Sequence, residues 1–293
     1  MPGSQWRLGW WAPLPPAAAP DDLVDAAIHG ALLAAVAAGA PLDRLGQHRL
    51  DALKGAGLAT ADGRPRFPVA LADSAKVVRA AAADLGGSVA RLVAGEWSRL
   101  EVEYEPVRAT VAGPGRPAGG PPAAFLVVGG LLLDLGVRRL LRRQGLAAPP
   151  FGSAYLWLAE GEGTAGTWFA RVTALPGRGW LVRFGRPGTP AWNLAAADPE
   201  AAPALPAARE PALRELCEAL GWSVVRLVED ALPGLDHLRR RVPGAEDEGA
   251  FLAWAYSLVV DEALHGLTAR GLLVPPPGDV AAVRVADPAL AGM

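Results

Sequence analysis

The sequence predicts an α+β protein that is mainly helical and carries a small antiparallel β meander. Apolar residues recur at helical spacing over long stretches of the N-terminal half and of the C-terminal third. Three short runs rich in aromatic and aliphatic residues lie between Tyr155 and Phe184, separated by turns that contain glycine. Hydrophobic residues make up 51% of the 293-residue chain and the formal net charge is only -2, so a sizeable core is expected and disorder is not.

Three regions are expected along the chain, which is long enough for one large domain or two ordinary ones. Residues 1–71 should form a small N-terminal module. Residues 72–150 should form a helical region built on a long amphipathic helix, and residues 151–293 should hold the meander and the C-terminal helices.

In the N-terminal region, residues 1–20 read as an irregular arm whose tryptophans pack onto the body. An aspartate cap then predicts a helix from Asp21 or Asp22 to Gly39. The segments expected next are a short helix Pro41–Leu45, a helix Gln47–Ala56, and two short strands over Leu58–Val69 around an Asp-Gly turn.

The long amphipathic helix is predicted from residue 72 to residue 107. Val78, Leu85 and Leu92 recur every seven residues and form an apolar stripe, which the pair Gly86-Gly87 interrupts. Such a stripe can pair with another helix of the same chain or with a second subunit, so a homodimer through residues 72–107 is one expectation.

The remaining elements follow from the same periodicities. A Gly/Pro-rich linker over residues 110–122 precedes a helix over Ala123–Gln144. The strands of the meander are expected near 155–158, 167–172 and 179–184, and the later elements are helices near 210–232, 236–241 and 247–270 and a strand over Val280–Val285.

The stretch Leu50–Phe67 reads L-x-x-L-K-G-A-G-L-A-T-A-D-G-R-P-R-F: an apolar-faced helix, then Gly-Leu, then a short hairpin. It resembles the recognition helix and wing of winged helix-turn-helix regulators, such as the multiple-antibiotic-resistance and arsenic-response types. The resemblance extends over residues 22–71 and implies a DNA-binding, transcriptional-regulator-like protein.

On such a module the nucleic-acid-binding residues would lie on the helix and the wing, where they contact phosphates. These residues are His48, Arg49, Lys54, Arg64 and Arg66. The alternative is an ordinary solvated surface, because Asp43, Asp51 and Asp62 are interspersed among the basic residues.

A second copy of this pattern is conceivable near the C-terminus. Leu264–Val274 echoes Leu50–Thr60 in the order helix, Gly-Leu, extended segment. Either the chain carries a degenerate second module, or both segments simply leave a helix through the same glycine cap.

A small-molecule sensor or carrier is the alternative function. The chain has ten tryptophans, and Trp97, Trp157, Trp168 and Trp180 lie in patterned segments that could line a pocket for an apolar small molecule. The same residues also suit an ordinary core. Arg171 and Arg183, on the other face of the predicted sheet, suit either an anion or solvent.

Catalytic, metal and cofactor chemistry finds little support, so no catalytic residue, metal ligand or cofactor is predicted. The single cysteine, Cys217, excludes a disulfide within the chain and a cysteine-rich metal site. Asp261, Glu262 and His265 lie one helical turn apart, but one Glu-x-x-His motif without a second copy is weak. The run Gly161–Gly166 joins two strands and lacks the helix that a dinucleotide loop requires.

No membrane partner is expected. The most apolar run, Phe125–Val137, is too short to span a bilayer comfortably and contains Asp134, and the N-terminus lacks a continuous apolar segment. The sequence therefore favours a cytoplasmic, non-catalytic regulator-like or interaction protein. The sensor or carrier is second, and an enzyme is third.

Overall fold

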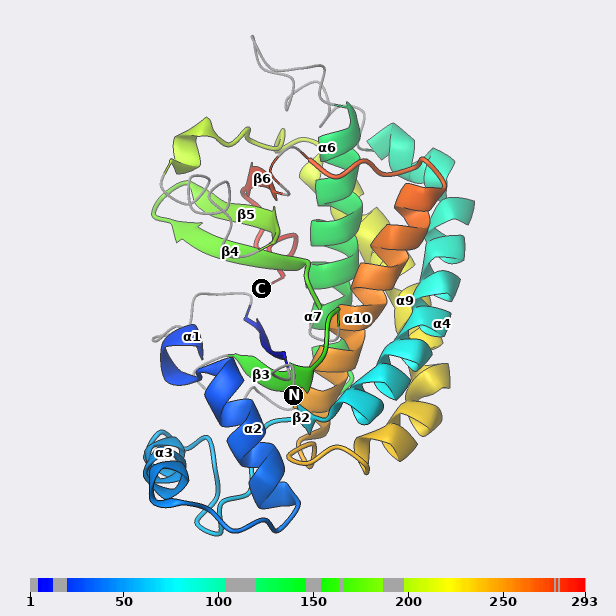
Figure 1. Cartoon of the computed structure of the whole chain (residues 1–293). Helices are drawn as coiled ribbons and strands as arrows, with labels where there is room; N and C mark the ends of the chain where they lie inside the picture. The colour runs from blue at the N-terminus through cyan, green and yellow to red at the C-terminus, as the bar shows by residue number, and fades with distance from the viewer. Residues whose placement is uncertain are drawn as a thin grey trace.

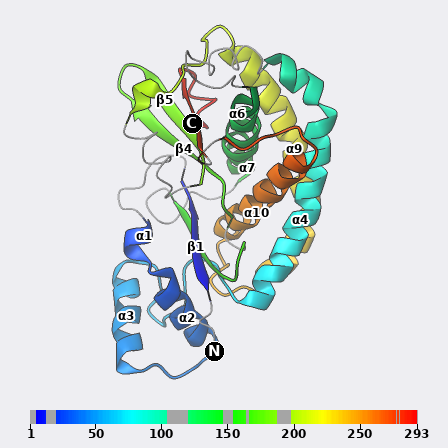
Figure 2. The same ribbon diagram turned by 45° about the horizontal axis from the view of Figure 1, so that its top comes forward.

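The computed structural model describes residues 5–12, 20–103, 120–145, 154–163, 166–186, 198–276, 278 and 280–292. It confirms the mainly helical α+β class. Long helices form one side of the molecule, and two three-stranded sheets and a small helical module form the other (Figures 1 and 2). The long helices are α4 (Ala72–Gly95), α9 (Glu210–Arg239), α10 (Glu248–Ala269) and the continuous helix made of α6 (Gly120–Phe125), η1 (Leu126–Gly136) and α7 (Val137–Arg143).

One sheet holds β4 (Phe169–Leu175), β5 (Gly179–Gly185) and β6 (Val280–Val285), all antiparallel in that order. Phe184 of β5 packs so closely on η1 that a Cβ on Gly129 would lie 2.2 Å from its ring. The two glycines of the apolar run Phe125–Val137 are therefore needed where the sheet meets the helix.

The other sheet corrects two predictions. β3 (Tyr155–Glu160) is not the first strand of the meander: it pairs antiparallel with β1 (Trp6–Trp11) and parallel with β2 (Val69–Ala70). The N-terminal arm is therefore partly a strand. Strand propensity is local, whereas the choice of a partner strand depends on what is buried on each face of the sheet.

Alternation along β3 separates two apolar clusters. Leu156 and Leu158 join a small cluster with the N-terminal module, whereas Tyr155 and Trp157 point into the main core. The small cluster also contains Trp6, Val24, Leu32, Leu33, Leu50, Leu53, Leu58, Phe67 and Val69. The core of the N-terminal module thus includes residues from the third predicted region of the chain.

The N-terminal module contains α1 (Pro20–Leu23), α2 (Ala26–Ala37) and α3 (Arg44–Gly55). The predicted first helix is interrupted because the side chain of Asp25 accepts a hydrogen bond from the amide of Ile28 and caps a new helix. The two predicted helices that follow are one helix, because Asp43 caps it on the amide of Gly46 and Gly46 lies inside the first turn.

A tight hairpin follows α3, as predicted, although it is closed by a single bridge between Ala59 and Pro65 and forms no regular strands. Gly63 in its turn has a φ of 88°, which glycine adopts without strain. The amide of Thr60 donates to the carbonyl of Arg64. Helices α2 and α3 and this hairpin together form the N-terminal module.

The stripe on α4 has its partner in the same chain. Val78, Leu85 and Val89 lie in the main core, where α4 packs along α10 and also contacts α9. Of the two alternatives left open for this stripe, the intramolecular one is observed, so the stripe no longer argues for a homodimer.

Leu264–Val274 resembles Leu50–Thr60 because both segments end a helix in the same way. Gly57 and Gly271 have φ values of 75° and 70°. The amide of Leu58 donates a hydrogen bond to the carbonyl of Leu53, and the amide of Leu272 donates one to the carbonyl of Leu267. This is the Schellman pattern of a glycine C-cap. After Gly271 the chain leads to β6 and not to a second hairpin.

Within the described ranges, no helix combines the length and the apolar character needed to cross a bilayer. The apolar run Phe125–Val137 is instead a fully buried core helix.

Candidate functional site

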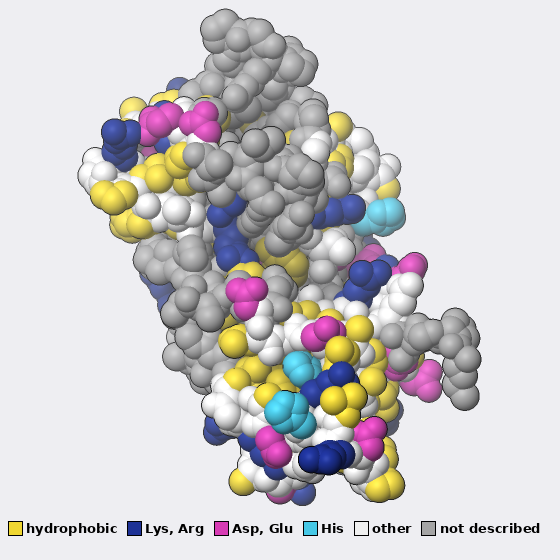
Figure 3. Space-filling model, turned by 60° about the vertical axis from the view of Figure 1, so that its left-hand side comes forward, with side chains coloured by type: hydrophobic (Ala, Val, Ile, Leu, Met, Phe, Trp, Pro, Cys, Tyr) yellow, Lys and Arg dark blue, Asp and Glu magenta, His cyan; other side chains and the backbone are white. Residues whose placement is uncertain are grey.

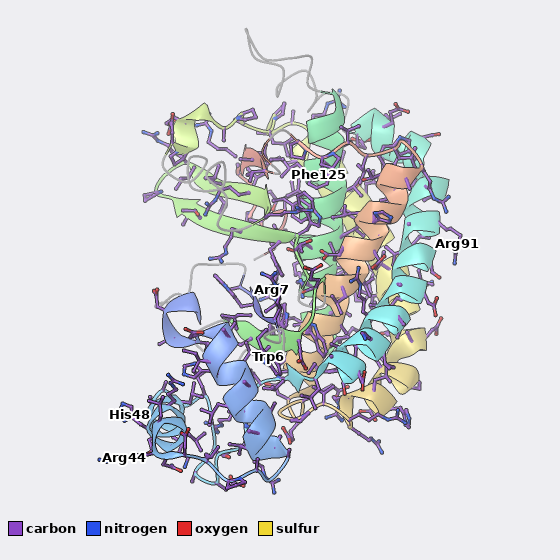
Figure 4. All side chains as sticks on the ribbon, viewed as in Figure 1. Trp6, Arg7, Arg44, His48, Arg91 and Phe125 are labelled. Carbon is purple, nitrogen blue, oxygen red and sulfur yellow. The ribbon has the colours of Figure 1, made fainter. Side chains whose placement is uncertain are left out.

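The outer face of α3 is the most exposed patterned surface of the N-terminal module. Leu50 and Leu53 point inward and are buried, whereas Arg44, Gln47 and His48 are exposed on the other face. Leu45 lies among them and is 55% exposed. Figure 4 shows that Arg44 and His48 project from α3 away from the body of the protein.

The two arginines on this helix have no ion-pair partner in the described part of the chain. Arg44 and Arg49 form no ion pair with an acidic residue there, whereas Lys54 lies 3.9 Å from the carboxylate of Asp51. Arg49 lies close to His29 of α2: burial lowers the pKa of that histidine, Asp25 raises it and Arg49 lowers it further. Figure 3 shows histidine and Lys/Arg side chains next to one another on the surface of the lower part of the molecule.

The basic residues around the hairpin are placed differently. Arg64 pairs with Asp62 at 3.0 Å, and Arg66 donates to the carbonyl of Gly57 at 3.5 Å. The pKa of Asp62 is lowered by the hydrogen bond from the Thr60 hydroxyl and also by Arg64 and Lys54. Each of these cations therefore has a local electrostatic or hydrogen-bonding partner within the module.

An open groove of about 590 Å³ separates the hairpin from the loop between α9 and α10. Arg64 and Arg66 line one wall, and Glu246 and Asp247 line the other. The amide of Val69 donates to Pro243 at 2.8 Å and holds the two walls together. The five predicted nucleic-acid-binding residues thus form two groups: His48 and Arg49 on an open helix face, and Lys54, Arg64 and Arg66 near acidic side chains.

The four tryptophans predicted to bind a ligand pack with the core. Trp157 is fully buried with its ring centroid 6.2 Å from that of Phe169, and Trp168 packs edge-on against Phe125 at 4.8 Å. Trp97 and Trp180 are partly buried against the same cluster. None of the four lines the grooves and cavities that we describe.

No family model, curated protein or solved structure matches this chain.

The carboxylates of Asp261 and Glu262, near the end of α10, already interact with other groups of the protein. The carboxylate of Asp261 accepts hydrogen bonds from the amide and hydroxyl of Thr167 and from the amide of Trp168. Burial raises the pKa of Asp261 to about 6 despite these donors. Glu262 pairs with Arg79 at 3.5 Å. Among the described residues, no group of three or more His, Cys, Asp or Glu side chains could hold a metal ion.

Arg171 of β4 and Arg183 of β5 lie directly opposite each other in the sheet of β4, β5 and β6. Arg183 is buried and does not face solvent. The guanidinium of Arg171 lies 3.6 Å from the ring centroid of Trp10, which joins the two sheets through a cation–π contact. Burial lowers the pKa of Arg183.

A buried polar network joins η1, α7, α10 and β4, and the sequence patterns did not reveal it. Asp134 accepts from Nε of Arg138 and from the amide of Ala170. Arg138 also donates to the carbonyl of Ala253 and the hydroxyl of Ser257. Both partners are almost fully buried and their hydrogen-bonding groups are occupied, so the network holds four elements together and offers no open catalytic group.

Cys217, the single cysteine of the chain, allows its burial in the core to be tested. Burial raises the pKa of Cys217 to about 12, so native protein should contain almost no thiolate at neutral or mildly alkaline pH. We expect a thiol-reactive reagent to label Cys217 only after unfolding in urea. Labelling at the same rate with and without denaturant would contradict its burial on α9.

Proposed function

We propose that this protein is a non-catalytic, transcriptional-regulator-like protein that binds duplex DNA through α3 of its winged-helix-like module. One observation carries the proposal: the outer face of α3 presents Arg44, Leu45 and His48 to solvent, with Arg49 beside them. The exposed Leu45 lies beside two arginines, Arg44 and Arg49, that have no acidic partner among the described residues, and this combination favours a contact surface. The same face also carries Asp51, which accepts a hydrogen bond from Gln47.

The position of α3 supports contact with the major groove. In helix-turn-helix proteins the second helix of the motif enters the groove and its N-terminal residues reach the base edges. Arg44, Gln47 and His48 occupy the first half of α3, which follows α2 after a six-residue connection. Arginine binds phosphate or guanine, and an apolar side chain such as Leu45 suits the methyl group of thymine.

The hairpin is expected to contribute less to DNA binding than a wing does in the regulators that the sequence resembles. Arg64 is paired with Asp62, and Glu246 and Asp247 face the hairpin across the groove. Phosphates brought to this groove would meet carboxylates, so the expected contact is made mainly by α3.

The test is a titration of fluorescent random-sequence duplex DNA at several salt concentrations. Wild-type protein should bind, with an affinity that falls as salt rises. The variant Arg44→Ala/Arg49→Ala should bind more weakly, and its salt slope should be shallower by about 1.8 if both side chains contact phosphates.

The matched control is Lys76→Ala/Arg91→Ala, which removes the same charge from exposed positions on α4. Arg91 lies on the opposite side of the molecule from α3 (Figure 4). The control should bind like the wild type. DNA binding through α3 would be refuted if the wild type does not bind at low salt, or if both double variants lose the same affinity for DNA. The exposed face of α3 would then be expected to bind a protein partner.

A further inference from the structure

A small cavity lies where β1, α7 and α10 meet, on the opposite face of β3 from the N-terminal module. Trp11, Arg138, Arg142, Tyr155 and Tyr256 line it together with aliphatic side chains. Its volume is about 10 Å³, which is room for one water-sized or monatomic guest.

Two buried donors in this lining lack an acceptor. Across the described residues, the indole Nε1 of Trp11 and the Nε of Arg142 are buried and form no hydrogen bond. Trp11 as a whole is only 2% exposed. Buried polar groups in folded proteins nearly always have a partner, so two such donors on one cavity point to a guest that accepts hydrogen bonds.

The charges around the cavity favour an anion. The charge of Arg138 is balanced by Asp134. Arg142 donates to the carbonyl of Gly292 at 2.8 Å, but no carboxylate of the described chain pairs with it. Burial lowers the pKa of Arg142, Tyr155 raises it, and Arg138 and Arg139 lower it further. A half-buried guanidinium with cationic neighbours is stabilised by a negative charge.

The acceptors beside the cavity include two carbonyl groups that already accept hydrogen bonds and the hydroxyl oxygen atoms of Tyr155 and Tyr256. The carbonyl of Ala253 accepts from both Arg138 and Ser257, and the carbonyl of Leu133 accepts from the hydroxyl of Tyr256. A water bound to the two donors would also need acceptors for its own protons, whereas a halide needs none.

We propose that this cavity binds a monovalent anion of halide size, held by Nε of Arg142 and Nε1 of Trp11. The ion neutralises Arg142 and ties the N-terminal strand β1 to α7. Another acid that acts on this lining is Asp247, which raises the pKa of Tyr155 and caps α10 on the amide of Ala250. This site is independent of DNA binding by α3.

The solution test follows thermal unfolding while sodium bromide replaces sodium gluconate at constant ionic strength. A ligand that binds only the folded state raises the unfolding midpoint with its concentration. The midpoint of the wild type should rise with bromide. Trp11→Phe removes the indole donor and Arg142→Lys removes the guanidinium Nε, so each should weaken bromide binding at least about tenfold.

The control is Arg143→Lys, because Arg143 is the next residue on α7, is exposed and pairs with Glu218 at 3.1 Å. It should respond to bromide like the wild type. Anomalous X-ray scattering from wild-type crystals grown with bromide needs no variant and should place the ion within hydrogen-bonding distance of both donors. A water without anomalous signal in the cavity, or an identical bromide response in all variants, would overturn the proposal.

Discussion

Replacing Arg138 by alanine is expected to lower the free energy of unfolding by about 3–5 kcal/mol, the range for removing one member of a buried ion pair. Arg138 is 3% exposed and Asp134 is fully buried, so the variant leaves a carboxylate inside the protein without its counter-charge. It also removes the donors to Ala253 and Ser257. The remaining bond from the amide of Ala170 cannot replace them.

The measurement is equilibrium urea unfolding followed by far-UV circular dichroism. Arg240→Ala is a matched control, because Asp236 and Arg240 have the same spacing on a helix as Asp134 and Arg138 but lie at the surface. Breaking that pair should change stability little, since exposed ion pairs are screened by water and salt.

The double variant Asp134→Leu/Arg138→Met separates the charge from the packing. It removes both charges and keeps apolar volume, so it should be more stable than Arg138→Ala. A similar, small loss in Arg138→Ala and Arg240→Ala would show that the Asp134–Arg138 pair is not buried as described.

Elements set by local chemistry could be predicted from the sequence, and the deviations have local reasons. The helical stripe of α4 and the glycine ending of α3 follow from periodicity and from a positive φ at Gly57. The starts of α2 and α3 were missed because Asp25 and Asp43 act as their caps, and cap strength decides which of several aspartates begins a helix.

Partners distant in sequence could not be predicted. The strand near Tyr155 was recognisable, but its pairing with Trp6–Trp11 joins segments about 150 residues apart. The same holds for the hairpin, whose arginines face Glu246 and Asp247 from the far end of the chain. A sequence pattern shows which residues are basic, but the neighbouring charge depends on the tertiary fold.

The buried network around Asp134 and Arg138 was in part predictable from the sequence and in part not. The four-residue spacing of Asp134 and Arg138 is visible in the sequence, and so is the apolar run that contains the aspartate. Their function as a buried pair depends on Ala170, Ala253 and Ser257, which approach only in the folded chain. An isolated acid inside an apolar run is therefore a signal that could have pointed to the network.

Two adjacent glycines of α4 should respond to alanine with opposite signs. A Cβ on Gly86 would lie 2.7 Å from Cβ of Glu262 and 2.9 Å from the carbonyl of Val259, both on α10. Since the second neighbour is backbone, the helices must separate, and Gly86→Ala should cost about 1–3 kcal/mol. A Cβ on Gly87 would meet only the end of Arg91 at 3.7 Å, so Gly87→Ala should stabilise the helix by about 0.5–1 kcal/mol.

Urea unfolding of the two single variants, measured against the wild type, tests this contrast. Because both changes are glycine to alanine on the same helix, their effects on the unfolded chain are nearly equal, and the difference between them reports the contact between α4 and α10. Two stabilised variants would mean that α4 does not approach α10 at Gly86, and the apolar stripe of α4 would again be available for a second subunit.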